Sequence, residues 1–171
     1  MDFPEIPFGD KWLIEHYKDL INTTLKGVGR AKYQFLQRVA KEMVEVYEEL
    51  DLIIDKGIAS FCARCLTPCC VNRHCFPDFE DLIFYITSNI GLPHLDYHAK
   101  EHERCTFLGE RGCTLPRSSR SYRCTWYFCD FSLDEFEKMD NLAYQNLENA
   151  LRRLQKKRDI LLVGFRELAL Q

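Results

Sequence analysis

The sequence lacks the features that mark several large classes of protein. No apolar run approaches the ~20 residues that a membrane-spanning helix requires. The N-terminal stretch MDFPEIPFGDKWL has no basic start, apolar core or small-residue cleavage site, so it does not predict a secretory signal. Positive charge is not in excess, because 23 Lys and Arg are set against 26 Asp and Glu. We therefore expect a cytoplasmic protein with reduced thiols that binds neither membranes nor nucleic acid.

The common catalytic fingerprints are missing as well. No P-loop, nucleotide-binding glycine pattern or Ser-His-Asp set is recognisable, which disfavours a conventional hydrolase or dehydrogenase. The many carboxylates show no spacing that singles out an acid/base pair. The sequence alone thus leaves open whether the protein is an enzyme.

Regularly spaced apolar residues predict a mainly α-helical protein. At 171 residues, the chain is long enough for a single domain, residues 1–171, with a core of its own. The pattern predicts one helix capped by Asp10 that ends at Gly27 and a second helix that ends at Gly57. A third helix is expected to begin at Pro77 and to end at Gly91.

The centre of the chain predicts irregular structure with a short β-hairpin. Two short apolar segments flank a turn in CTFLGERGCTL, residues 105–115, which is typical of a small hairpin. Before it, we expect a short helix opened by Pro93. Three histidines recur at four-residue steps there and would share one helix face: His94, His98 and His102.

The C-terminal part predicts one long helix or two. Ser132 and Glu135 fit a capping box ahead of an apolar series that runs over residues 136–168. A break is expected near Asp159 or Gly164. Together these elements predict a small helical bundle, in which N- and C-terminal helices enclose a cysteine-rich irregular centre.

Cysteine is the residue that sets this chain apart. Nine are present, so complete pairing as internal disulfides is impossible. Five fall within FCARCLTPCCVNRHC, residues 61–75, and four follow downstream. Thiolates this crowded would repel one another without a cation, whereas a metal ion deprotonates and holds them. The spacing therefore predicts a multi-ligand metal site.

Three short stretches carry a resemblance to a known family. CARCLTPCC, CTFLGERGC and RSYRC together resemble the CxxCxxxCC cysteine-cluster proteins described as zinc- or iron-chelating, over residues 61–129. Members are often labelled iron-sulfur proteins, and the cysteine region of flagellin lysine N-methylases is distantly similar. Methylation is not expected here, because nothing in the sequence resembles a methyl-donor site.

The resemblance implies a pool of metal ligands. Seven cysteines match the family pattern: Cys62, Cys65, Cys69, Cys70, Cys105, Cys113 and Cys124. Cys129, five residues beyond Cys124, is the next candidate. Cys75 lies outside the pattern. We expect it to be a buried or free thiol, with redox sensing as an alternative.

The number of thiols favours an iron-sulfur centre, most simply [4Fe-4S], with a redox or electron-transfer role. Iron-sulfur clusters and zinc both accept an all-thiolate shell, but seven or eight thiols exceed the four that one structural zinc needs. The alternative is a zinc-stabilised interaction module without redox activity. In either case the protein or redox partner is not identified by the sequence.

Neighbouring polar residues have two interpretations each. His94, His98 and His102 could bind a metal ion or form an exposed polar stripe. His74 could donate a hydrogen bond to a cysteine sulfur. The arginines of RSSRSYR, residues 117–123, could bind phosphate or, more simply, offset the negative charge of a thiolate centre.

Overall fold

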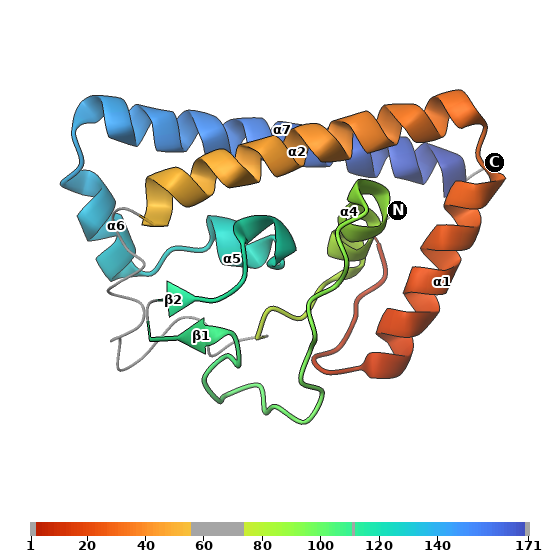
Figure 1. Ribbon diagram of the computed structural model, residues 1–171, viewed down its shortest axis with the longest axis horizontal. Helices are drawn as coiled ribbons and strands as arrows, with labels where there is room; N and C mark the ends of the chain where they lie inside the picture. Colours follow the sequence, from red (N-terminus) through yellow and green to blue (C-terminus); the bar gives the residue numbers. More distant parts are fainter. Residues whose placement is uncertain (1–2, 56–73, 111, 170–171) are drawn as a thin grey trace.

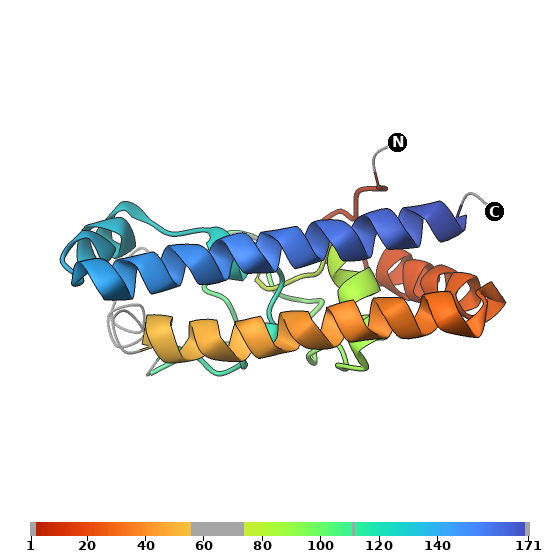
Figure 2. The same ribbon diagram turned by 90° about the horizontal axis from the view of Figure 1, so that it is seen from above.

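Two long antiparallel helices form the upper layer of the molecule (Figures 1 and 2). The computed structural model describes residues 3–55, 74–110 and 112–169, and in these ranges the protein is mainly α-helical with a short β-hairpin, as predicted. The long pair is α2 (Arg30–Asp55) and α7 (Asn141–Ala169). The remaining elements lie beneath it: α1 (Lys11–Gly27), α4 (Phe79–Ser88), β1 (Leu108–Gly109), β2 (Gly112–Cys113), the 3-10 helix η2 (Arg117–Ser119), α5 (Arg123–Trp126) and α6 (Asp130–Glu137).

Local capping signals fix the first and third predicted helices. An Asp10 carboxylate oxygen accepts the Leu13 N–H at 2.9 Å and starts α1. Asp78 and Asp81 form a full capping box at the start of α4, since each side chain accepts the backbone N–H of the other. That helix is followed by Asn89, whose φ of 62° is the left-handed conformation that closes many helices. The first helix is confirmed with its predicted end at Gly27. The third helix is also confirmed, but it ends at Ser88 and not at Gly91.

The α2 core face is wider than a single stripe. Leu36, not Phe35, is buried at its start, and Ile54 is more buried than Ile53 at its end. The helix needs the wider face because both α7 and α4 pack against it. The expected end at Gly57 lies outside the described residues. The buried apolar positions of α2 are Leu36, Val39, Ala40, Met43, Val46, Tyr47, Leu50 and Ile54.

The two long helices approach closely near one glycine. A Cβ added at Gly164 would come within 2.8 Å of the Leu36 side chain, which is almost completely buried. Gly164 therefore does not break α7, as the sequence suggested it could. It lets the two helices pack together.

The C-terminal series divides at a different point from the one expected. The predicted capping box is wrong, because Ser132 lies inside α6 and Cys129 is the residue before that helix. α7 instead begins after Asp140, whose carboxylate accepts the Ala143 N–H at 2.9 Å. It then continues unbroken past Asp159.

The short helix expected after Pro93 does not form. The segment from Gly91 to Phe107 consists of turns and extended chain. The Asp96 carboxylate accepts the His98 N–H at 2.9 Å, a local turn that competes with helix formation. His94, His98 and His102 therefore do not share a helix face, and the argument that they grip a metal from one face is wrong.

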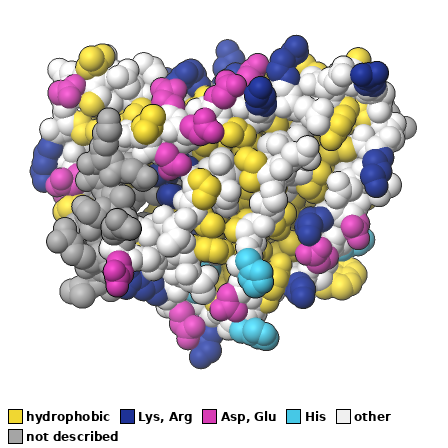
Figure 3. Space-filling model, in the orientation of Figure 1, with side chains coloured by type: hydrophobic (Ala, Val, Ile, Leu, Met, Phe, Trp, Pro, Cys, Tyr) yellow, Lys and Arg dark blue, Asp and Glu magenta, His cyan; other side chains and the backbone are white. Residues whose placement is uncertain are grey.

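The predicted hairpin is confirmed. β1 and β2 pair antiparallel, with Leu108 opposite Cys113 and Gly109 opposite Gly112. Within the ranges that the structure describes, no helix has the length and apolar character needed to cross a bilayer. On the face seen in Figure 3, basic and acidic side chains alternate around a central band of apolar groups.

Candidate metal centre

Four cysteines from separate parts of the described chain lie near one another. Cys75 lies just before α4, Cys105 precedes the hairpin, Cys113 is on β2 and Cys124 is in α5 (Figure 1). Each of the four is close enough for its pKa to respond to the charge of at least one other. All are free thiols. Segments that are far apart in the sequence thus bring four sulfurs together.

Cys75 and Cys124 form the tightest pair, because their side chains are hydrogen-bonded to each other. This bond, with burial, raises the pKa of Cys75 well above its ordinary value, and the same bond lowers the pKa of Cys124 to about 7. Cys75 is therefore the S–H donor and Cys124 the sulfur that carries negative charge. Cys75 is 4% exposed, whereas Cys124 is exposed to solvent.

Cys105 and Cys113 lie farther from this pair. Burial raises the pKa of Cys105 to about 11, and the charges of Cys113 and Cys124 add to that increase. Burial also raises the pKa of Cys113, while the guanidinium of Arg120 opposes the rise. Without a cation, both thiols stay protonated at neutral pH. A metal ion would reverse this balance.

Two arginines supply positive charge next to the thiols. Arg117 is 3% exposed, and its backbone N–H and its Nε donate to the two Asp51 carboxylate oxygens at 2.9 and 3.1 Å. Arg120 donates from Nε and Nη2 to the Leu115 carbonyl at 2.9 and 2.7 Å. After the bond from Cys75, these guanidinium groups are among the causes that lower the pKa of Cys124. They support the interpretation that the RSSRSYR arginines offset thiolate charge.

Backbone donors point at the sulfurs as well. The Ser121 N–H donates to the Cys75 sulfur at 3.2 Å, and the Cys75 sulfur lies 4.0 Å from the Ser119 carbonyl oxygen. The Ser121 side chain also hydrogen-bonds Cys124 and lowers its pKa. The segment between η2 and α5 therefore wraps around both members of the pair.

A buried ionic network holds that segment in place. An Asp81 carboxylate oxygen accepts the Tyr122 N–H at 3.0 Å and a bond from Arg158 Nη1 at 3.2 Å. The Arg158 guanidinium stacks 4.2 Å from the centre of the Tyr122 ring and also pairs with Glu80 at 2.8 Å. The network joins α4, α7 and the segment that carries Cys124.

His74 does not play the expected role among the described residues. It is 2% exposed, and neither ring nitrogen has a hydrogen-bond partner there, so it donates to no described sulfur. The Phe8 ring meets it edge-on, with the ring centres 5.4 Å apart. Its φ of 40° and the φ of 63° at Cys75 place two consecutive non-glycine residues in the left-handed region.

The other candidate ligands are distributed as follows. The structure brings together Cys105, Cys113 and Cys124. Cys129 lies at the start of α6, where its sulfur is 3.3 Å from the Ser132 hydroxyl oxygen. The four remaining ligand predictions fall outside the described residues: Cys62, Cys65, Cys69 and Cys70.

The donor set fits a thiolate-bound metal in its chemistry. Soft sulfur ligands, N–H donors to sulfur and nearby guanidinium groups are what zinc and iron-sulfur sites use. In residues 3–55, 74–110 and 112–169, no three His, Cys, Asp or Glu side chains converge tightly enough to hold a metal ion by themselves. A complete site built by this chain would therefore need ligands from the CARCLTPCC motif.

Cys75 is a buried free thiol, as predicted, but the sequence did not indicate its position beside Cys124. Its place depends on the turn at residues 74–75 and on the Ser121 N–H, 46 positions away. No local spacing signals such a contact.

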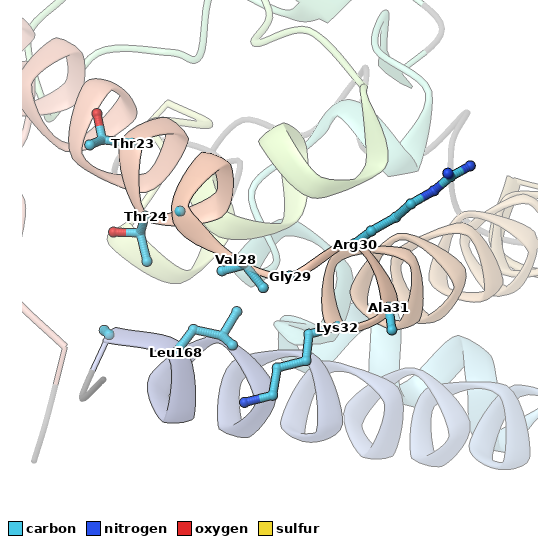
Figure 4. A pocket seen from close by; sticks show the side chains of 10 residues that line it. Thr23, Thr24, Val28, Gly29, Arg30, Ala31, Lys32 and Leu168 are labelled. Atoms are coloured by element: carbon cyan, nitrogen blue, oxygen red, sulfur yellow. The ribbon is translucent and has the colours of Figure 1, made fainter.

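A separate hollow lies at the other end of the molecule. It measures about 700 Å³ and is formed where the turn between α1 and α2 meets the end of α7 (Figure 4). Thr23, Thr24, Lys32 and Leu168 are among its lining residues, and no cysteine or histidine is. It offers none of the soft ligands found near Cys75.

Comparison with protein-family models, curated proteins and solved structures finds no match. The cysteine-cluster resemblance therefore stays a prediction carried by the motif residues.

Proposed function

We propose that this protein binds metal through cysteine thiolates and holds an iron-sulfur centre, most simply [4Fe-4S]. The observation that carries the proposal is the gathering of four described thiols from four segments, under guanidinium and N–H donors. When bound, such a cluster would supply one-electron chemistry. The proposal includes a redox or electron-transfer role in the cytoplasm, where thiols stay reduced.

The residues of this chain have distinct parts in the proposal. Cys105, Cys113 and Cys124 act as ligands together with the thiols of CARCLTPCC. Arg117 and Arg120 offset negative charge, and the Asp51 carboxylate fixes the Arg117 side chain. Trp126 and Tyr127, at the end of α5, are exposed and would be available for contact with a partner.

A zinc-stabilised module is the second candidate, and one observation favours it. A single structural zinc takes four thiolates, so two or three of the thiols near Cys124, together with one or two from CARCLTPCC, would complete its shell. In that case the protein would have no redox activity, and the metal would stabilise the fold around the hairpin and α5.

Colour separates the two candidates. Protein purified without oxygen should be brown, with broad absorption near about 400 nm, if it holds an iron-sulfur cluster. A colourless protein with stoichiometric zinc would support the module, and a protein with neither metal would refute both. Cys62→Ser and Cys65→Ser should each lower metal content, whereas unchanged content in both would remove these two thiols from the ligand set.

A further inference from the structure

We propose that Cys75 is a ligand of the metal centre and binds it together with Cys124, although it lies outside the CxxCxxxCC motif. The inference rests on the proposed function, because it assigns a ligand to the same site. Three independent features of the described residues support it: the backbone before α4, the donors that surround the sulfur, and the contact between the two sulfurs.

The backbone at this position is strained in a way that serves the Cys75 side chain. His74 and Cys75 have φ values of 40° and 63°, a backbone conformation that residues other than glycine rarely adopt. Each such residue costs about 1–3 kcal/mol, and strain of this size is concentrated at functional sites. The turn places the Cys75 sulfur against the segment between η2 and α5.

The Ser121 N–H is placed to stabilise negative charge on the Cys75 sulfur once a metal ion displaces its proton. The Ser121 N–H donates to it at 3.2 Å, although a neutral thiol sulfur is a weak acceptor. Backbone donors of this kind are typical of metal-bound thiolates, whose charge they stabilise. A cysteine that served only as a small apolar group would not need such a donor in a site where 4% of it is exposed.

The contact with Cys124 supplies the second ligand. In the metal-free protein a proton joins the two sulfurs. A single zinc ion would take that place with little movement of the backbone, because two thiolates on one tetrahedral ion lie about 3.8 Å apart. In [4Fe-4S] each iron takes one cysteine, so Cys75 and Cys124 would bind two neighbouring irons and their sulfurs would move apart. In either site Arg120 beside Cys124 would limit the charge left on the two thiolates.

Substitution at Cys75 tests the inference. Cys75→Ser and Cys124→Ser should each lose metal relative to the wild type, measured as iron, zinc and acid-labile sulfide per chain after purification without oxygen. The matched control is Thr87→Ala, which removes a similarly small side chain that is 1% exposed in the neighbouring helix α4. It should keep the wild-type metal content and absorption spectrum.

A second measurement uses the wild-type protein, in case the Cys75 variant does not fold. Diamide oxidises two thiols to a disulfide and takes up the two electrons and two protons, becoming the hydrazine. In metal-free protein it should join Cys75 to Cys124, as detected by peptide mapping. In the metal-loaded protein this disulfide should be lost, because both sulfurs are ligands.

The outcomes are distinguishable. Wild-type protein without any metal would refute the proposed function and the inference with it. Wild-type protein with metal, together with a Cys75→Ser variant that matches Thr87→Ala in metal content and spectrum, would overturn the inference alone. A Cys75–Cys124 disulfide that forms equally in loaded and metal-free protein would also overturn it.

Discussion

Replacing Arg158 with Met should strongly destabilise the protein, and the effect should depend on pH. Arg158 is 4% exposed, and its guanidinium pairs with Asp81 at 3.2 Å and with Glu80 at 2.8 Å. Burial opposes its charge, but Asp81, Asp78 and Glu80 hold the pKa of Arg158 above its ordinary value. Met keeps most of the apolar volume, so the substitution removes mainly the charge.

The magnitude follows from what is left behind. Removing one partner of a buried ion pair costs about 3–5 kcal/mol, because the other charge stays in the interior without compensation. That charge is Asp81, which is 2% exposed. Asp81 also accepts a hydrogen bond from the Tyr122 N–H, so the segment that carries Cys124 should become less ordered in the variant.

The pH dependence has a definite sign. Burial and the Asp78 charge raise the pKa of Asp81 from 3.8 to about 7 in the folded protein, although Arg158 opposes the rise. A raised carboxyl pKa gives a stabilising contribution that is complete below the unfolded value and is lost as pH rises through about 7. Without Arg158 the pKa of Asp81 should rise further, so the loss of stability between pH 5 and pH 8 becomes larger. The destabilisation by Arg158→Met should therefore be about 1 kcal/mol or more larger at pH 8 than at pH 5.

Urea unfolding followed by circular dichroism measures this prediction at both pH values. Arg153→Met is the matched control, because Arg153 lies on the same helix but its side chain is 51% exposed and pairs with Glu49. That variant should change stability by about 1 kcal/mol or less. An Arg158→Met penalty as small as this control, or one that is equal at pH 5 and pH 8, would refute the account of the network.

Three further predictions concern the site and its support. In metal-free protein, Cys124 should react with iodoacetamide at half its maximal rate near pH 7, whereas Cys105 should reach half its maximal rate near pH 11. Peptide mapping measures the alkylation of each cysteine, and the same pH dependence for both would contradict the assigned Cys75–Cys124 hydrogen bond. Asp51→Asn should destabilise the protein by about 2–3 kcal/mol in urea, because the Arg117 guanidinium loses its charged acceptor, and an unchanged midpoint would argue against that role. Gly164→Val should cost about 1–3 kcal/mol through overpacking against Leu36, and a stabilised variant in thermal melts would show that α2 and α7 are less closely packed.

Helices with local signals were predictable from the sequence. Asp10 caps α1 as expected, and α4 begins close to the predicted start at Pro77 with Asp78 as its cap, because a capping side chain and its helix are neighbours in the chain. The helix expected around His98 failed because the Asp96 side chain closes a turn there. Ser132 resembled a cap but lies one turn into α6, where its hydroxyl meets the Cys129 sulfur.

The site was predictable in its residue types but not in its geometry. The crowding of cysteines indicated a shared cation, and Cys105, Cys113 and Cys124 do lie in one region. Cys75 is buried and free, as predicted. Its contacts with positions 119–124 were not predictable, because packing of the segment after η2 against α4 brings these residues to it. Likewise, nothing near Arg158 in the sequence indicates that this helix residue fixes the segment carrying Cys124.

Metal counting on the wild-type chain tests the central claim most directly. Protein purified without oxygen should carry iron and acid-labile sulfide in equal amounts, about four of each per chain for [4Fe-4S]. One zinc per chain would keep the thiolate site but replace the redox role with a structural one. Protein that folds to the same helical content with neither metal would contradict the account.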